Sequence, residues 1–356
     1  MKSVWRLRAV VNPKYHYLTS VKYFKNQLQE NGALIYGGPF SSLILRQYSS
    51  SPPVHIHAPR QLEGATCMIT GGSSGIGLGI AQRFLLEGAE KIILVGRNKQ
   101  RLYNALSQLD TIIPIPSHTD LCLKPEEGAH SEIIHQGRFC LVVGDVGNPS
   151  FWGEDVKKLM DPVDILVNAA GVSHSSLLST AKDEHISQML NTNLQGTILA
   201  SRTMARRAFR LQRRGARKQS PSPTEGSDPS SHYSGTKCII NVSSLHASKG
   251  GVVGVATYAS TKAGVIALTR ALVAETSLSA PPNTFSNLRV NVIVPGYVET
   301  DILDELSEQF RENAKQSIPV RRFGTVEEVA DATMFLATNQ YANNCVLNLD
   351  GGLSAM

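Results

Sequence analysis

The chain has 356 residues, of which 42% are hydrophobic and 18% charged, and its formal net charge is +6. This length suffices for one large α/β domain with tails, and no apolar run reaches the ~20 residues that a membrane-spanning helix needs. The five cysteines are scattered without a Cys-x-x-Cys pair, which argues against a zinc site or a disulfide framework.

Residues 1–48 carry the whole net charge, because they hold seven Lys or Arg residues and a single acidic residue, Glu30. The neutral remainder offers no general attraction to nucleic acids. A basic, acid-poor segment with interspersed hydroxyl and apolar residues is typical of a mitochondrial transit peptide, with cleavage expected after Tyr48. We therefore expect a transit peptide at 1–48, a linker at 49–60 and one domain at 61–356, in the mitochondrial matrix. A disordered basic tail on a cytosolic enzyme is the alternative.

Seven short apolar, β-branched runs alternate with helix-length segments along the domain. They cover residues 65–69, 91–95, 139–143, 164–167, 238–242, 289–294 and 345–349. The alternation predicts a Rossmann-type, doubly wound α/β fold, in which a seven-stranded parallel sheet carries helices on both faces. Segments 110–137 and 215–236 are rich in turn-forming and polar residues, and we interpret both as surface insertions.

The first run leads into the glycine-rich sequence T-G-G-S-S-G-I-G at residues 70–77, and then into a helix. Gly71 permits a tight turn, Gly75 lets the backbone approach a pyrophosphate, and Gly77 lets the helix pack closely on the strand. The first N–H groups of the helix would face the phosphates. The pattern predicts a dinucleotide site, with a purely structural turn as the alternative. The predicted contacts in this turn are Gly71, Ser73, Ser74, Gly75, Ile76 and Gly77.

The second run ends at Arg97, where an acidic residue would bond a ribose 2′-hydroxyl. The planar fork of an arginine suits a 2′-phosphate. We therefore expect NADPH rather than NADH, and a surface arginine that caps the strand is the alternative. Further cofactor contacts are expected where the next two strands end. They are Asp145 and Val146 for the adenine, and Asn168, Ala169 and Gly171 for the ribose.

Tyr258 and Lys262 place a phenol and an ammonium one helical turn apart on the same face. A fixed positive charge would lower the pKa of the phenol from about 10, so that it can transfer a proton near neutrality. The lysine can also bond the nicotinamide ribose. Tyr233 and Lys237 have the same spacing, but Tyr233 lies in the Ser/Pro-rich segment with no strand before it. We therefore assign the proton donor to Tyr258.

Ser244 follows the fifth run, where its hydroxyl can polarise a substrate carbonyl together with Tyr258. The neighbouring Ser243 is expected to be structural, although an exchange of the two roles stays open. Asn193 lies on the helix before this strand, and we expect its side chain to hold a water that relays protons from Lys262.

In this order the motifs resemble those of the short-chain dehydrogenase/reductase family, over about residues 60–356. The resemblance implies a catalytic tetrad of Asn193, Ser244, Tyr258 and Lys262. The interval from Ser244 to Tyr258 is one residue longer than is usual in the family. The resemblance also implies cofactor contacts after the sixth run, with Thr300 on the nicotinamide carboxamide. These contacts are Pro295, Gly296, Val298 and Thr300, besides Tyr258 and Lys262.

Residues 320–330 and 349–354 are similar to those of 3-oxoacyl-[acyl-carrier-protein] reductases, in particular the fungal mitochondrial ones. This similarity implies NADPH-dependent reduction of 3-oxoacyl thioesters in mitochondrial type II fatty-acid synthesis, by a homotetramer. A ketone or hydroxysteroid reductase of the same family is the alternative enzyme. A non-catalytic NADPH sensor is the alternative of another class, against which the intact Ser244, Tyr258 and Lys262 argue.

Residues 202–218 contain eight Lys or Arg residues and no acidic residue. Five arginines fall at helical spacing along one side, and we expect them to dock the acidic acyl carrier protein. A solvated basic helix face is the alternative. The five are Arg206, Arg210, Arg213, Arg214 and Arg217.

Overall fold

The computed structural model describes residues 60–112, 121–122, 131–218, 236–249, 251–278, 288–304 and 307–356. The predicted transit peptide at 1–48, nearly all of the linker and most of both insertions lie outside these ranges. In the described part of the chain, no helix is long and apolar enough to cross a membrane.

The seven strands expected from the sequence form a parallel sheet, and their bounds agree with the prediction within one residue at either end. Their order in the sheet is β5-β2-β1-β6-β7-β8-β9. They are β1 (Thr66–Thr70), β2 (Lys91–Gly96), β5 (Phe139–Val143), β6 (Ile165–Asn168), β7 (Lys237–Val242), β8 (Leu288–Pro295) and β9 (Val346–Leu349).

The sheet of the described residues has nine strands, however, so the prediction of seven strands, all parallel, was wrong at one edge. Strands β3 (Leu121–Cys122) and β4 (Glu132–Gln136) add an antiparallel extension beside β5. Both belong to segment 110–137, which we expected to be only a surface insertion. Ile134 of β4 is almost fully buried in the core, which explains why this edge pairs with β5. The residues around these short strands are rich in Pro and His, which is typical of loops, so the sequence did not predict the strands.

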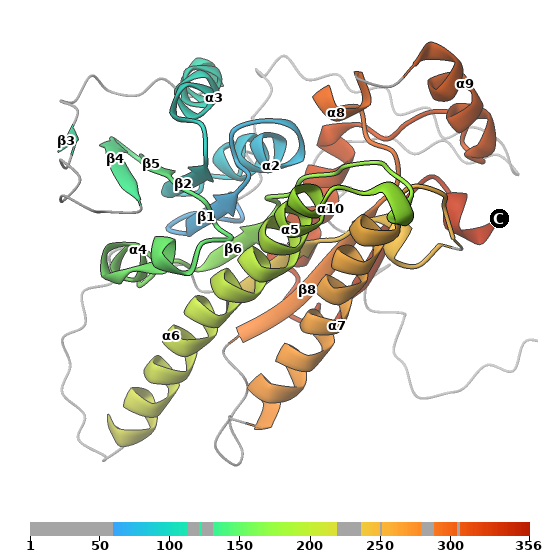
Figure 1. Cartoon of the computed structure of the whole chain (residues 1–356). Helices are drawn as coiled ribbons and strands as arrows, with labels where there is room; N and C mark the ends of the chain where they lie inside the picture. The colour runs from blue at the N-terminus through green and yellow to red at the C-terminus, as the bar shows by residue number, and fades with distance from the viewer. Residues whose placement is uncertain are drawn as a thin grey trace, which may run out of the picture. The chain divides into compact units, whose positions relative to one another are not determined.

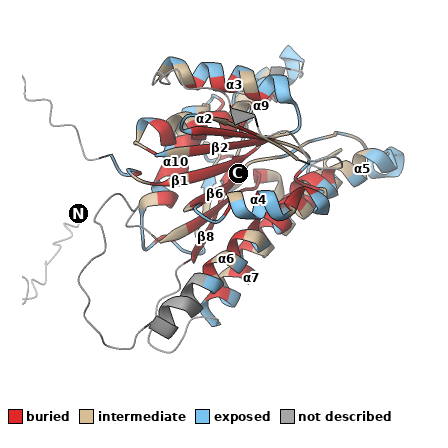
Figure 2. Ribbon diagram, turned by 90° about the vertical axis from the view of Figure 1, so that its left-hand side faces the viewer, coloured by how far each residue is buried: buried red, intermediate tan, exposed pale blue. Residues whose placement is uncertain are grey.

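Helices cover both faces of the sheet, as Figures 1 and 2 show. One layer contains α2 (Gly75–Leu86), α3 (Lys99–Ile112) and α10 (Val326–Thr338); the other contains α4 (Glu154–Leu159), α6 (Gly196–Lys218) and α7 (Ala256–Leu278). The remaining helices are short: α5 (Asp183–Met189), α8 (Asp301–Asp304), α9 (Glu308–Ser317), the π-helical η3 (Leu190–Gln195), and the 3₁₀ segments η1 (Pro149–Trp152), η2 (Leu178–Thr180), η4 (Leu245–Ala247) and η5 (Leu353–Ala355).

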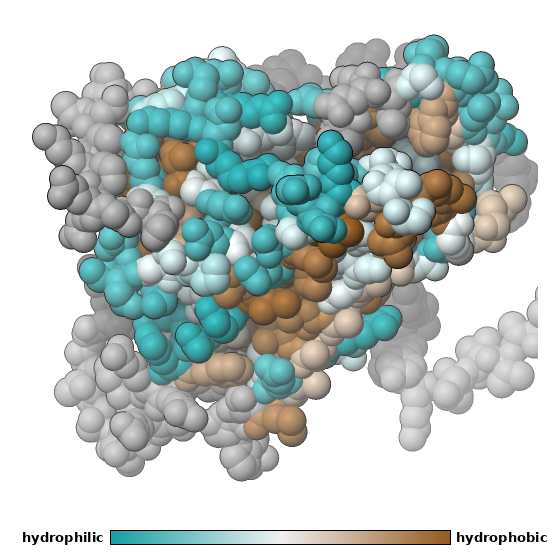
Figure 3. All heavy atoms as spheres, in the orientation of Figure 1, coloured by the Kyte–Doolittle hydropathy of each residue, from teal (hydrophilic) through white to brown (hydrophobic). Residues whose placement is uncertain are grey.

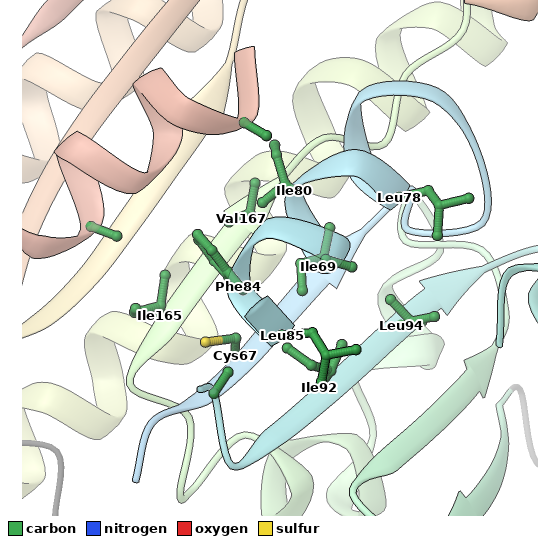
Figure 4. Close-up of a cluster of buried hydrophobic side chains, with 14 of the residues drawn as sticks. Cys67, Ile69, Leu78, Ile80, Phe84, Leu85, Ile92, Leu94, Ile165 and Val167 are labelled. Atoms are coloured by element: carbon green, nitrogen blue, oxygen red, sulfur yellow. The ribbon is translucent and has the colours of Figure 1, made fainter. Parts of the chain in front are cut away.

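The central strands are mostly apolar because helices bury both of their faces. Figure 4 shows Phe84 of α2 among Ile69 and Val167 of β1 and β6, all fully buried. Truncation of such an aromatic residue to Ala typically costs about 3–5 kcal/mol. This core fixes the edge where the parallel strands end, and a crevice at that edge is where doubly wound sheets bind ligands.

Candidate active site

The turn between β1 and α2 has the shape that its glycines predict. Gly71 and Gly75 have φ values of +69° and +51°, a region that side chains rarely adopt. A Cβ at Gly71 would lie 2.7 Å from the Cα of Ala170, and one at Gly77 would lie 2.3 Å from the carbonyl oxygen of Gly71. Helix α2 begins at Gly75 without a side-chain cap from Ser74. The turn therefore directs a close backbone surface and a helix N-terminus toward any bound phosphate.

A cavity of about 500 Å³ opens above this turn, at the carboxyl ends of the parallel strands. Its volume falls within the range of small-molecule and cofactor sites. Every residue predicted to contact the cofactor lines it, with the exception of Asn168. Ser244 lines it as well, so the turn, the strand ends and the start of α7 converge on one space.

Asn168 requires a correction. Its Nδ2 donates to Oδ1 of Asn241 at 2.8 Å and to Oγ of Ser201 at 3.2 Å, and the residue is buried. The side chain therefore points into the protein, where it joins β6 to β7 and α6. The small residues Ala169 and Gly171 after it do line the cavity, as expected.

Arg97 lies exposed at the mouth of the cavity, and a second arginine, Arg101, lines the same mouth. Arg101 was not predicted from the sequence. Its backbone N–H donates to Oδ1 of Asn98 at 3.0 Å, which fixes the first turn of α3 directly after β2. The spacing of four residues between the two arginines at the start of a helix was the available signal. Ser73 closes this corner, with its Oγ 3.4 Å from the position of a Cβ on Gly96.

Tyr258 and Ser244 both line the cavity, and the hydroxyl of Ser244 lies close enough to the phenol to affect its pKa. Tyr258 is in the first turn of α7, and Ser244 precedes η4 after the end of β7. Burial raises the pKa of the Tyr258 phenol above its usual value, while the hydrogen bond with Ser244 lowers this pKa in part. The phenol is therefore protonated near neutral pH and is held beside a second hydroxyl, which is the arrangement that protonates a carbonyl oxygen.

The choice between the two serines is decided by the partner of Ser243. Its Oγ donates to the backbone carbonyl of Lys262 at 2.8 Å, which attaches the strand end to α7. Ser243 therefore has the structural position, and the hydroxyl of Ser244 is the one that meets Tyr258.

Lys262 is buried, and its Nζ lies 5.8 Å from the centre of the Tyr258 ring. Nζ donates to the carbonyl oxygen of Val242 at 2.9 Å. Burial lowers the pKa of Lys262 to about 8. We expected the lysine to lower the pKa of the tyrosine, but in this structure burial dominates and raises the pKa of Tyr258. The charge of Lys262 is thus placed to stabilise a tyrosinate after proton transfer, rather than to ionise Tyr258 beforehand.

Asn193 is fully buried in η3, next to this group. Its Oδ1 accepts from the N–H of Val172 at 2.8 Å, and its Nδ2 donates to the carbonyl of Val172 at 2.9 Å and to Thr261 Oγ1 at 3.2 Å. These bonds occupy both amide hydrogens and give Asn193 a positioning role, while Oδ1 accepts a single bond and keeps a lone pair for the predicted relay water. Asn193 fixes the strand-end loop against α7, through a π-helical turn of the kind often found at functional sites.

The competing pair is only partly described, because Tyr233 lies outside the described residues. Lys237 is the first residue of β7, so it lies at the amino ends of the parallel strands, whereas the cavity lies at their carboxyl ends. Its Nζ donates to the carbonyl of Val163 and lies 3.5 Å from Oδ1 of Asp164. Lys237 is therefore engaged far from the site.

Comparisons with known proteins agree with this geometry. A profile described as short chain dehydrogenase matches residues 65–120 and 118–217, and one described as Enoyl-(Acyl carrier protein) reductase matches residues 229–354. A 3-oxoacyl-[acyl-carrier-protein] reductase of Rattus norvegicus is 33% identical over 81% of this chain and 97% of its own length. The chain belongs to the short-chain dehydrogenase/reductase family. This short-chain reductase is accordingly an oxidoreductase that uses a nicotinamide cofactor.

Two further similarities were found, one to a relative and one to a solved structure. A 3-oxoacyl-[acyl-carrier-protein] reductase of Thermotoga maritima is 31% identical over 82% of this chain and 99% of its own length. The crystal structure of a putative 2-deoxy-D-gluconate 3-dehydrogenase from Agrobacterium tumefaciens, with bound NADP, matches this fold with a TM-score of 0.63 and 24% sequence identity. The match covers 84% of this chain and 99% of that protein. The structural likeness confirms the α/β fold of the short-chain reductase.

The residues of the cavity fit a nicotinamide dinucleotide. The close approach of Gly71, Gly77 and Ala170 leaves a surface that any Cβ would fill, and α2 supplies the helix N-terminus for a pyrophosphate. Thr300 lies over the turn, with its methyl group 3.3 Å from the position of a Cβ on Gly75. The cofactor would therefore extend from the two arginines, across the turn, to Tyr258 and Lys262.

The basic side of α6 does not face this site. A Cβ on Gly196, where α6 begins, would lie 2.8 Å from the cavity-lining Val146. At 1.5 Å per residue, Arg210 is roughly 21 Å further along the helix, and Arg207 already contacts Asp161 before the start of β6. Arg206 and Arg210 are exposed at this distant end, and the side chains of Arg213, Arg214 and Arg217 lie outside the description. The geometry gives the predicted docking of a carrier protein on these arginines no support.

Proposed function

We propose that the enzyme reduces the 3-oxo group of acyl thioesters carried by acyl carrier protein, with NADPH as the hydride donor. The observation that carries the proposal is the convergence of the Ser244 and Tyr258 hydroxyls in one cavity, together with a dinucleotide cradle and a buried lysine. Two relatives that are at least 31% identical over more than 80% of this chain are named for this activity.

Each catalytic residue has its own role in the reaction. Ser244 and Tyr258 donate hydrogen bonds to the substrate carbonyl oxygen and stabilise the negative charge that develops on it. When bound, the cofactor supplies the hydride that forms the new C–H bond. Tyr258 then transfers its phenolic proton to the alkoxide oxygen, and its raised pKa keeps that proton in place beforehand. The positive charge of Lys262 stabilises the tyrosinate that remains.

The preference for NADPH follows from charge at one corner of the cavity. Arg97 and Arg101 supply two guanidinium groups there, and Ser73 supplies a hydroxyl. Such a group of donors suits the 2′-phosphate of NADPH, whereas NADH carries an uncharged ribose hydroxyl at that position.

Localisation and assembly form part of the proposal. We propose that residues 1–48 direct the enzyme to the mitochondrial matrix, on the basis of their basic, acid-poor composition. We also propose a homotetramer. Its support is the exposed face of α7, which presents Ala263, Ala267, Ala271 and Ala274, and the hydrophobic residues that gather over α6 and α7 in Figure 3. Small residues on an exposed helix face let a second helix approach closely.

The direct test is NADPH oxidation by the protein of residues 49–356 with acetoacetyl-acyl carrier protein. We expect it to be turned over with a higher kcat/KM than free ketones or 3-oxosteroids, and NADH to be the poorer donor. A higher kcat/KM for a steroid or a simple ketone would favour the alternative reductase and overturn the assignment of substrate.

A further inference from the structure

His246 lines the cavity two residues after Ser244, and none of the catalytic steps above uses it. Its ring meets the edge of Tyr258 at a centroid distance of 6.2 Å, and that of Tyr297 at 6.1 Å. The backbone N–H of His246 donates to Oγ of Ser244 at 3.3 Å. The imidazole is therefore attached to the same short segment as the carbonyl-polarising hydroxyl.

The ring of His246 has no hydrogen bond among the described residues. Its Nδ1 is enclosed and lacks a partner, so Nε2 is the nitrogen that can reach a ligand in the cavity. Burial lowers the pKa of His246, with a further contribution from Lys249. The ring is consequently neutral near pH 7, and in the tautomer with its hydrogen on Nε2 it can donate to a ligand in the cavity. Because His246 lines the cavity and no hydrogen bond of its ring is formed with a described residue, Nε2 is available to a ligand there.

The position of the His246 ring is fixed by its contact with Tyr297. Tyr297 contacts Phe323 at a centroid distance of 5.8 Å and packs against the cluster that contains Leu245 and Leu303. A donor held in this way does not lose much conformational freedom when a ligand binds, which favours recognition.

We propose that His246 donates a hydrogen bond from Nε2 to a second carbonyl oxygen of the substrate, one methylene away from the carbonyl that is reduced. The site would thus select 1,3-dicarbonyl compounds over isolated ketones. This inference rests on the proposed function, because a 3-oxoacyl thioester is such a dicarbonyl. With the 3-oxo group on Ser244 and Tyr258, the thioester oxygen would be the substrate atom that meets the adjacent His246. A ketone without the second oxygen leaves the N–H unpaired, which penalises its binding.

The test compares two substrates of equal chain length in the full-length enzyme, namely ethyl acetoacetate and 2-heptanone. The measured quantity is the ratio of their kcat/KM values at pH 7. We expect His246→Leu to lower this ratio about tenfold, the effect of one lost hydrogen bond in a desolvated site. His246→Gln, whose amide nitrogen can occupy the place of Nε2, should restore most of the ratio. His246→Asn, whose amide lies at the place of Nδ1, should not restore it.

The outcomes separate the inference from the proposed function. If the wild-type enzyme reduces acetoacetyl-acyl carrier protein but His246→Leu leaves the ratio unchanged, the role of His246 is wrong and the proposed function stands. Equal restoration by Gln and Asn would also contradict a bond from Nε2. If the wild-type enzyme does not reduce the carrier-bound thioester at all, the proposed function itself fails. A dissociation constant for NADPH that is unchanged in all three variants shows that the cofactor site is intact.

Discussion

The Nζ of Lys262 donates to the carbonyl oxygen of Val242 at 2.9 Å, and the lysine is almost fully buried. This contact holds the ammonium beside Tyr258 at the end of β7. Burial of the charge lowers the pKa of Lys262 to about 8, and the same burial reduces the stability of the folded state. The lysine therefore links the stability of the protein to its activity.

Lys262→Met should stabilise the protein and inactivate it. Removal of a buried charge raises the free energy of unfolding at pH 7 by roughly 1–2 kcal/mol, after the lost bond to Val242 is subtracted. The gain should shrink as the pH rises from about 8 toward 10.5, because there the unfolded chain holds a proton that the folded one has released. Urea unfolding at pH 7 and pH 10, together with NADPH oxidation, measures both effects. A less stable variant at pH 7 would contradict the account.

The activity should decline on the alkaline side as Lys262 loses its proton. The charged lysine predominates below its pKa of about 8, so kcat/KM for NADPH should fall tenfold per pH unit above that value. Lys262→Arg keeps its charge and should move this decline to higher pH, even if it is slower overall. An unchanged decline in the arginine variant would assign the titration to another group.

Some of these features could be read from the sequence, and others could not. Tyr258 and Ser244 were predictable because each stands at a fixed interval from a strand end, which local pattern reveals. The direction of the Asn168 side chain was not predictable, since it depends on Asn241 and Ser201, which are distant in the sequence. The raised pKa of Tyr258 likewise depends on burial by the whole fold, whereas the spacing to Lys262 had suggested the opposite shift.

The edge strands and Arg101 show two further limits of the sequence. β4 pairs with β5 through tertiary packing around Ile134, and its Pro- and His-rich flanks are typical of loops. In the sequence, Arg101 cannot be told apart from other surface arginines. It reaches the cavity mouth because α3 begins directly after β2. Both features depend on how elements meet, and a single sequence does not specify that.

The two serines should respond in opposite ways to truncation. Ser244→Ala removes a donor to the developing oxyanion and should lower kcat by about 10²–10³ with little change in stability. Ser243→Ala breaks the bond to the Lys262 carbonyl and should lower the free energy of unfolding by about 1 kcal/mol, with a smaller loss of kcat. Thermal unfolding and steady-state kinetics of both variants show which serine is catalytic and which is structural. A larger loss of kcat in Ser243→Ala would exchange the two roles.

The arginines at the cavity mouth should determine cofactor preference. Arg97→Ala and Arg101→Ala should each raise KM for NADPH about tenfold, and should leave KM for NADH nearly constant, because a charged hydrogen bond to the 2′-phosphate is lost. Arg206→Ala, at the distant end of α6, is the matched control and should change neither constant. Equal effects on both cofactors in the Arg97 variant would place the 2′-phosphate elsewhere.

The most direct test of the central claim is NADPH oxidation with acetoacetyl-acyl carrier protein by Tyr258→Phe and, as its control, by Tyr233→Phe. Loss of the phenolic proton should lower kcat by about 10²–10⁴ in Tyr258→Phe, while its dissociation constant for NADPH changes little. Tyr233→Phe should retain the wild-type kcat. Full activity in Tyr258→Phe, or loss of activity in Tyr233→Phe, would contradict Tyr258 as the proton donor.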